Sequence, residues 1–315
     1  MPRIIAVLWD FDKTLITGYM QAPLFEYYGV DSVRFWDEVN ALPAFHAPEG
    51  TDLLTSDFLY LNHMLTYVRR GVFAGLNNTL LRSFGAKQSM APGIPQLFDH
   101  IAAFTASEGK FQSAQIEIEH YVISTGLRQI VLGSPVAPYM RYVWGCEFLE
   151  REAPPGFLDG ATDEESVREI REIGYVIDHT SKTRAVFEIN KGVREKLGFD
   201  VNSRMPRPQR RVPFDNMIYI ADGPSDTPSL SLIRQNGGRT YGVFQQGSPR
   251  DWKQAKLLLD QERVDAIGPA DYRLGSEAHS WLLQAVAEIA DRIANCPAFE
   301  NNIAPGAPPA RHIYR

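Results

Sequence analysis

The chain has 315 residues, which is long enough for a large domain with an inserted lobe. Its 44% hydrophobic and 22% charged residues are ordinary for a globular protein with a sizeable core. A formal net charge of −6 argues against nucleic acid or an anionic membrane as the main partner, whereas a small anionic substrate stays compatible with a local cation.

The N-terminus, Met1 to Trp9, has one basic residue before an apolar run, as a secretory leader does. That run reaches only six residues before Asp10, which is too short for a leader, and no stretch approaches the roughly 18 apolar residues of a membrane span. Cys146 and Cys296 show no metal-ligand spacing, so two free thiols in a reducing compartment are expected. These features predict a cytoplasmic protein.

Three short apolar runs, each followed by polar residues, predict the buried strands of a parallel sheet. They cover Ile4 to Trp9, Tyr121 to Ile123, and Met217 to Ala221. Runs of this length that are rich in β-branched residues are typical of strands covered on both faces. Helical patterns separate the runs, so we expect an α/β fold with a doubly wound, Rossmann-like parallel sheet. Ligands of such sheets bind beyond the carboxyl ends of the strands, where the polar residues stand.

The long excursion between the first two runs, residues 17–90, predicts a helical cap inserted into the core. Apolar residues recur at helical spacing from Phe58 to Val68 and again from Leu76 to Phe84. Gly85 then stands where a glycine C-cap would end the second of these helices. The segment shows no strong strand pattern.

The rest of the chain is assigned to one core domain, residues 1–16 and 91–296, followed by a loose C-terminal tail, residues 297–315. Residues 142–177 are ambiguous, because strand patterns flank a helix-capping signature, and a β-hairpin beside the core is the favoured interpretation. Three further elements are expected: a strand over 240–244, a strand near 264–267, and a final helix from 276 to about 294.

Two carboxylates stand directly after the first run, in the segment Asp10-Phe11-Asp12-Lys13-Thr14. A carboxylate at a strand end can attack phosphorus, and a second one can protonate the leaving oxygen and later activate water. Asp10 and Asp12 are therefore candidates for these catalytic roles. The pattern alone is weak, and an acidic turn without function is the alternative.

Ser124 follows the second run, with Thr125 and Gly126 behind it. A hydroxyl and backbone N–H groups at an expected helix N-terminus suit the oxygen atoms of a phosphate group. We therefore expect Ser124 to take part in catalysis and Thr125 and Gly126 to bind phosphate.

Asp222 and Asp226 follow the third run, four residues apart, with Gly223 permitting a tight turn between them. Asp222 and Asp10 together offer hard oxygen ligands for a divalent cation, and Mg²⁺ is the usual choice beside phosphate. Gathering these carboxylates with Asp12 at one sheet edge would be electrostatically costly without a cation. The constellation therefore predicts a Mg²⁺ site.

A lysine is also required, to offset charge on the phosphate and on the nucleophile. Lys182 lies at the start of an expected helix, from which its side chain would point into the site. Lys191 lies near the later part of that helix, beside Gly192, and is expected to face solvent. Lys182 is the preferred candidate.

These residues, in this order, resemble the haloacid dehalogenase superfamily of phosphatases. The resemblance is greatest to its phosphoserine-phosphatase-like branch, which carries a helical cap between its first two motifs. It rests on four motifs: the segment from Asp10 to Thr14, Ser124, Lys182, and the segment from Asp222 to Asp226. The position of the cap and the hairpin-like stretch before Lys182 agree with it.

The resemblance implies that Asp10 forms a phosphoaspartate and that Asp12 is the general acid and base. It also implies that Mg²⁺ is bound by Asp10, by Asp222 and by the backbone carbonyl of Asp12. Asp226 would then support the metal shell and Lys182. Superfamily members with alanine or serine in place of the second aspartate do other chemistry, so Asp12 favours phosphatases and phosphomutases.

One position departs from the pattern of the branch. Phosphoserine phosphatases carry a glutamate five residues after the motif threonine, and Tyr19 stands there in this chain. A tyrosine offers no charge to an ammonium group, so phosphoserine is expected to be a poor substrate and the leaving group to lack a free amine. The alternative is that Tyr19 only packs inside the cap. If an amine is bound, a cap carboxylate such as Glu26, Asp37 or Glu38 must supply the charge.

Taken together, the motifs predict a Mg²⁺-dependent phosphatase that hydrolyses a phosphate monoester of a small soluble metabolite. A phosphotransferase or phosphomutase that uses the same phosphoaspartate is the first alternative. A catalytically idle binding protein is the second, and intact Asp10, Asp12, Lys182 and Asp222 argue against it. The oligomeric state is left open.

Overall fold

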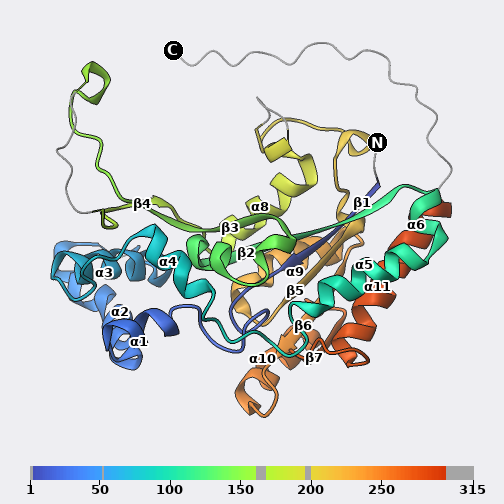
Figure 1. Cartoon of the computed structure of the whole chain (residues 1–315), viewed down its shortest axis with the longest axis horizontal. Coiled ribbons are helices and arrows are strands. Elements are labelled where there is room, and N and C mark those ends of the chain that lie inside the picture. Colours follow the sequence, from blue (N-terminus) through green and yellow to red (C-terminus); the bar gives the residue numbers. More distant parts are fainter. Residues whose placement is uncertain (1–2, 52, 161–167, 196–199, 296–315) are drawn as a thin grey trace.

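The structure is a computed structural model and describes residues 3–51, 53–160, 168–195 and 200–295. Its strands form one seven-stranded sheet within these residues, in the order β4-β3-β2-β1-β5-β6-β7 (Figure 1). Every neighbouring pair is parallel except β3 and β4, which are antiparallel. The strands are β1 (Arg3–Trp9), β2 (Ile116–Leu127), β3 (Met140–Leu149), β4 (Glu172–Tyr175), β5 (Met217–Ala221), β6 (Arg239–Phe244) and β7 (Ala266–Pro269).

Helices flank the sheet on both faces, as the sequence predicts for a doubly wound α/β fold. Helices α8 and α9 pack together on one face, and α5 and α11 pack together on the other (Figure 1). The helices are α1 (Ala22–Tyr28), α2 (Ser32–His46), α3 (Ser56–Arg69), α4 (Asn78–Gly85), α5 (Gln96–Ser107), α6 (Gly109–Ser113), α7 (Arg128–Gly133), α8 (His179–Lys191), α9 (Thr227–Gln235), α10 (Pro249–Asp260) and α11 (Glu277–Asn295). None of them, in the described part of the chain, has the length and apolar character that a bilayer crossing needs.

The sheet reverses its winding direction at β1. The chain proceeds from β1 outward to β2 and β3, and it later returns to the other side of β1 to lay down β5, β6 and β7. Trp9 at the end of β1 pairs with Val122 on one side and with Ile220 on the other. This register brings the carboxyl ends of β1 and β5 to the same edge, at the switch point where open α/β sheets bind ligands.

The central strand is fully enclosed. Residues Ile4 to Trp9 are each at most 2% exposed. The Trp9 ring meets Phe98 and Tyr272 edge-on, at 5.8 and 5.7 Å between ring centroids. Its Nε1 donates a hydrogen bond to Nδ1 of His120 at 3.3 Å, and burial lowers the pKa of His120 to about 3, which keeps that acceptor neutral. The strand end that carries the first motif is therefore rigidly packed.

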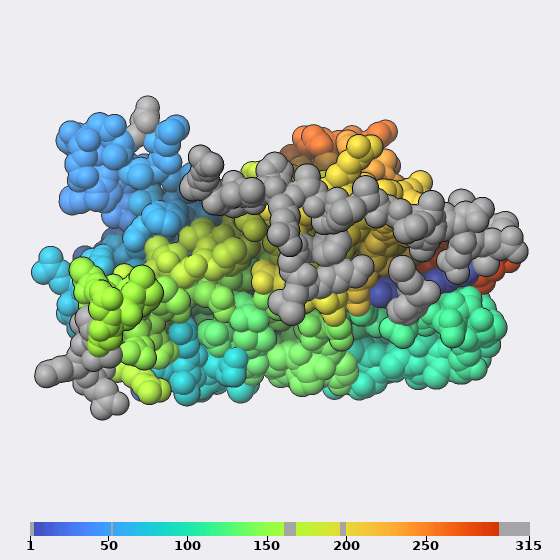
Figure 2. Space-filling view, turned by 90° about the horizontal axis from the view of Figure 1, so that it is seen from above, coloured from blue at the N-terminus to red at the C-terminus, as the bar shows by residue number. Residues whose placement is uncertain are grey.

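Residues between β1 and α5 form helices α1 to α4, which we call the cap helices (Figure 1), and the blue residues of the first of them lie at one end of the molecule (Figure 2). Their shared core is aromatic, with Phe25 lying 4.9 Å from Phe35 and 6.4 Å from Phe73 between ring centroids. Helix α3 covers the run with helical spacing that the sequence shows from Phe58 to Val68. The division of the chain into a cap domain over 17–90 and a surrounding core domain stays a prediction.

Gly85 does not end α4 as a left-handed C-cap. It is the last residue of the helix and is buried, and a Cβ built on it would lie 2.2 Å from the carbonyl oxygen of Ile130 in α7. The expected C-cap is therefore wrong, and the glycine serves a different purpose. It lets the backbones of α4 and α7 approach each other closely.

Other elements agree with the sequence. Strands β3 and β4 form the expected antiparallel pair, with Phe148 opposite Ile173. Strand β6 and helix α11 occupy the predicted stretches, and β7 begins two residues later than the strand predicted near 264–267. The proposed helix-capping signature that begins at Thr162 and the tail over 297–315 lie outside the described residues.

Candidate active site

Asp10 and Asp12 lie in the tight turn that follows β1. Lys13, between Asp12 and the cap, has a backbone φ of 55°, which is uncommon for a residue other than glycine. Its N–H donates to the carbonyl of Gly18 at 3.0 Å, and its own carbonyl accepts a hydrogen bond from Nε2 of Gln245 at 2.8 Å. The turn that presents the two carboxylates is thus held from the cap side and from the β6 side.

Lys182 reaches the site from the first turn of α8. That helix begins in a capping box, in which the Asp178 carboxylate accepts from the Ser181 N–H and the Ser181 hydroxyl accepts from the Asp178 N–H. Lys182 is 0% exposed, and its Nζ donates to Oδ1 of Asp10 and to Oδ1 of Asp226, both at 2.8 Å. Burial acts to lower the pKa of Lys182, but the charges of Asp10 and Asp226 outweigh it, so the lysine is held charged.

Asp226 is enclosed by hydrogen-bond donors. Its Oδ1 accepts from Lys182 and also from the hydroxyl of Tyr219 at 2.5 Å, and its Oδ2 accepts from the hydroxyl of Ser225 at 2.7 Å. The side chain is completely buried. These contacts make Asp226 an anchor that fixes Lys182 beside Asp10.

The other carboxyl groups of the site have raised pKa values. Burial raises the pKa of Asp10 to about 6 against the opposing charge of Lys182. Burial and the charge of Asp10 raise the pKa of Asp12 to about 7, although the Met20 N–H, 2.8 Å from Asp12 Oδ1, opposes the shift. Burial also raises the pKa of Asp222 well above its usual value. Three neighbouring carboxyl groups that resist ionisation together indicate a place for a cation.

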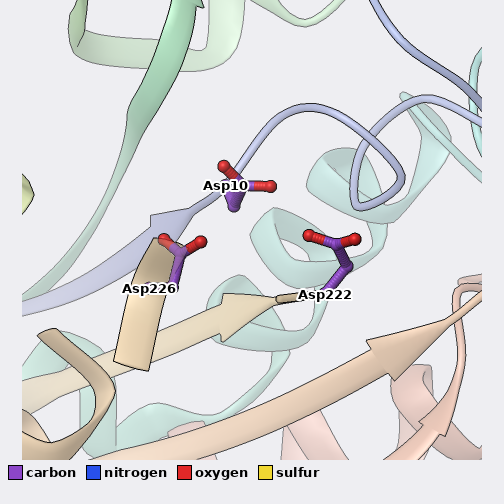
Figure 3. Close-up of side chains that lie close together, drawn as sticks. All are labelled: Asp10, Asp222 and Asp226. Atoms are coloured by element: carbon purple, nitrogen blue, oxygen red, sulfur yellow. The ribbon is translucent and has the colours of Figure 1, made fainter. Parts of the chain in front are cut away.

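A group of carboxylates at this edge has the chemistry of a metal site. Oxygen atoms of Asp10, Asp222 and Asp226 all lie within 4.8 Å of one another, and the three side chains converge on one space (Figure 3). The Asp222 carboxylate makes no hydrogen bond with any other described residue, so its oxygens are free for a ligand. This donor set fits a hard divalent cation. The carboxylate of Asp12 does not belong to the group.

Ser124 lies at the same edge, but not at a helix N-terminus. Strand β2 continues through it to Leu127, and α7 begins only at Arg128, so the expected helix start is wrong. The Ser124 hydroxyl is buried and accepts the N–H of Gly126 at 3.0 Å. The Thr125 carbonyl accepts a hydrogen bond from the cap at 2.9 Å, donated by the hydroxyl of Tyr60.

A cavity of about 640 Å³ separates the cap helices from the strand ends, and we call it the cap cavity. Asp12, Thr125 and Gly126 line it from the core. Tyr19 also lines it, and Nζ of Lys13 lies over the Tyr19 ring at 5.1 Å from the centroid. The ammonium group of Lys13 therefore covers one face of the Tyr19 ring.

Most lining residues from the cap helices were not identified as site candidates from the sequence, and Asp37 is the exception. Helix α2 contributes Val33, Trp36, Asp37 and Asn40. Trp36, Asp37 and Asn40 follow Val33 by three, four and seven residues, so the four residues share one face of the helix. This spacing is the sequence signal that could have identified them. From the sequence, Asp37 was considered only as one of three cap carboxylates that could bind an amine of the substrate.

Further lining residues come from elsewhere in the chain. Asp57 from α3 and Arg250 from α10 also line the cavity, whereas Glu26 does not. Glu38 does not line it either, because its carboxylate is held by the hydroxyl of Tyr67 at 2.7 Å and by Nε2 of His63 at 2.9 Å.

The two candidate lysines are clearly separated. Lys191 is not solvent-facing as expected, because its Nζ donates to the carbonyl groups of Val201 and Ser203. It therefore fastens a loop and does not reach the carboxylates. The stretch after β6, to which no role was assigned from sequence, supports the site through Nε2 of Gln254, which donates to the Asp222 carbonyl at 3.1 Å.

A protein of Borreliella burgdorferi described as an "uncharacterized protein" is 38% identical to this chain over 288 residues, covering 90% of this chain and 97% of the relative. This chain belongs to the same family. No model of a known protein family matches the sequence. This family relationship therefore assigns no activity to the chain.

Solved structures show what the fold is. The chain is similar to a probable phosphoserine phosphatase from Vibrio cholerae, with a TM-score of 0.50 and 13% identity over 92% of this chain and 68% of that one. A haloacid dehalogenase family hydrolase from Salmonella enterica gives a TM-score of 0.47 and 14% identity over 85% of this chain and 68% of that one. The first likeness, together with the sheet order, shows that this chain shares the α/β fold of the Vibrio cholerae protein.

Proposed function

We propose that this protein is a Mg²⁺-dependent phosphatase that hydrolyses a small phosphate monoester through a phosphoaspartate on Asp10. One observation carries the proposal: Nζ of the buried Lys182 lies between the carboxylates of Asp10 and Asp226, at the switch point of the sheet. Asp12, two residues on, opens into the cap cavity. This arrangement provides a nucleophile, a fixed cation and an acid at the mouth of a substrate pocket.

In the first step an oxygen of Asp10 bonds to phosphorus and the ester P–O bond breaks. Asp12 gives its proton to the departing oxygen, and its pKa, raised to about 7, keeps that proton available near neutral pH. In the second step Asp12 accepts a proton from water as the water oxygen bonds to phosphorus. The bond between phosphorus and Asp10 breaks, which releases inorganic phosphate and restores both carboxyl groups.

The charges around Asp10 suit this chemistry. Lys182 stabilises the ionised nucleophile and the negative oxygens that gather around phosphorus. A bound Mg²⁺, held by Asp10 and Asp222 with Asp226 behind them, would neutralise phosphate charge. The hydroxyl of Ser124 and the backbone of Thr125 and Gly126 are proposed to contact the remaining phosphate oxygens.

Phosphate release from para-nitrophenyl phosphate tests the proposal. Activity is expected with Mg²⁺, to be lost in excess chelator, and to fall by orders of magnitude in Asp10→Asn. Asp159→Asn is the matched control, because Asp159 is exposed, ends a short 3-10 helix (Phe157–Asp159) and does not line the cap cavity. Release of para-nitrophenol without inorganic phosphate, in the presence of an alcohol acceptor, would instead indicate a phosphotransferase.

A further inference from the structure

The cap side of the cap cavity carries negative charge. Asp37 on α2 and Asp57 on α3 both line it. Asp37 makes no hydrogen bond or ion pair with any other described residue, and the ion pair of Asp57 among these residues is with the imidazole of His179, whose Nε2 lies 3.5 Å from Oδ2 of Asp57. Arg250 is the one lining cation among the described residues, and it belongs to α10 of the core and not to the cap helices. A ligand that enters from the phosphate site therefore meets an acidic wall.

Aromatic rings stand beside these carboxylates. Trp36 and Tyr60 both line the cap cavity, with their ring centroids 5.6 Å apart. The Tyr60 hydroxyl is bound to the Thr125 carbonyl, so its ring is fixed between the phosphate end of the cavity and Trp36. The face of a tryptophan ring attracts positive charge, and more so where water is excluded.

A buried amide on the same wall lacks a partner. Gln21 lines the cap cavity and is only 5% exposed, yet its Oε1 accepts no hydrogen bond from the described residues. A buried acceptor that stays unpaired destabilises the fold. This oxygen has almost no accessible surface, so a ligand N–H group would relieve the cost only after a turn of the Gln21 side chain.

We propose that the cap cavity selects phosphate monoesters whose leaving group carries a positively charged nitrogen, with Asp37 and Asp57 as the selecting residues. The proposal rests on the proposed phosphatase function and names its substrate class. It reverses the expectation drawn from Tyr19 alone, because the structure places other carboxylates where the missing charge is needed and pairs Tyr19 with Lys13. The two carboxylates would repel an anionic leaving group and would gain nothing from a neutral one.

The test compares two esters of the same shape. Phosphocholine carries a quaternary nitrogen, and dimethylbutyl phosphate has a carbon in its place. The wild-type protein is expected to show a kcat/KM about tenfold higher for phosphocholine, which is the size that a cation–aromatic contact and two partly exposed charge contacts produce together. Asp37→Asn and Asp57→Asn should each reduce this ratio by about threefold or more. Glu26→Gln, an exposed cap carboxylate outside the cavity, should leave the ratio as in the wild type.

The outcomes separate this proposal from the one it rests on. Equal kcat/KM for the two esters, or a preference for phosphoglycolate, whose leaving group is anionic, would overturn the substrate class and leave the phosphatase standing. An unchanged ratio in both aspartate variants would overturn the roles of Asp37 and Asp57. No phosphate release from these esters or from para-nitrophenyl phosphate would defeat the phosphatase proposal itself, and the substrate class with it.

Discussion

Nζ of Lys182 lies 2.8 Å from Oδ1 of Asp10 and 2.8 Å from Oδ1 of Asp226. One ammonium group thus joins the turn after β1 to the turn after β5. Because all three side chains are buried, the lysine has both an electrostatic and a structural role. Its removal would leave two carboxylates facing each other without a counter-charge.

Lys182→Ala is therefore expected to lower kcat by about a hundredfold or more. The unfolding free energy at neutral pH should fall by about 3–5 kcal/mol, as for other broken buried ion pairs. Lys191→Ala is the matched control on the same helix, because its Nζ binds loop carbonyl groups and no carboxylate of the site. Steady-state kinetics and urea unfolding measure both effects. A greater loss of kcat in Lys191→Ala would contradict the assignment.

The second prediction concerns Asp222 and the metal. Its pKa is raised in the folded protein, so between its usual value of 3.8 and the raised one the folded chain holds a proton that the unfolded chain releases. The metal-free protein is therefore destabilised as pH rises through this window. Asp222→Asn should remove that loss, so that at pH 7 without metal the variant melts about 2–6 °C above the wild type.

Added Mg²⁺ should reverse the order, because it binds the folded wild type more tightly than the variant. Thermal melts with and without Mg²⁺, at pH 5 and pH 7, provide the readout without any need for activity. An equal rise in Tm for both proteins on adding Mg²⁺ would argue against Asp222 as a ligand.

The third prediction concerns the pH dependence of Asp12. Its pKa is raised to about 7, so the proton that it gives to a leaving oxygen is lost as pH rises above that value. For an alkyl phosphate, kcat/KM should consequently decline above about pH 7. Para-nitrophenolate leaves without a proton, so the decline should be weaker for para-nitrophenyl phosphate. Identical profiles for the two substrates would show that Asp12 is not the acid.

The fourth prediction tests the packing of α4 on α7. Gly85→Ala would place a Cβ 2.2 Å from the Ile130 carbonyl oxygen, so helix backbones must separate, at a cost of about 1–3 kcal/mol or more in unfolding free energy. Gly109→Ala is the control, because a Cβ there meets nothing within 4 Å and the position is helical. Its effect should be neutral or slightly stabilising. Equal unfolding free energies of the two variants would contradict the close approach of α4 to α7 at Gly85.

The place where the candidate site residues meet was largely predictable from sequence, because one physical rule sets it. Parallel strands end at a common edge, so polar residues that follow buried runs must gather there, and this rule brought Asp10 and Asp222 together. Lys182 followed from its position in the first turn of a helix. The end of strand β2 was harder to predict, because the strand is twelve residues long and Ser124 lies in its interior. A run of three apolar residues does not show where such a strand ends.

The cap cavity was less predictable, because the rotation of a helix is set by its packing. In α2 the buried residues are Phe35 and Val39, which turn Trp36 and Asp37 toward the cavity. Which cap carboxylate meets the substrate therefore depends on contacts with α1 and α3 that no local pattern encodes. The close contact of Gly85 with α7 could not be predicted for the same reason, because α7 lies more than 40 residues away in the chain.

The central claim is a covalent phosphoaspartate, and trapping it is the most direct measurement. Wild-type protein is mixed with excess substrate, quenched in acid, digested and examined by mass spectrometry. Phosphate is predicted on the peptide that contains Asp10, sensitive to hydroxylamine as an acyl phosphate is, and more abundant in Asp12→Asn if that variant slows the second step. Rapid turnover by the wild type with phosphate on no peptide, or on a residue other than Asp10, would contradict the account.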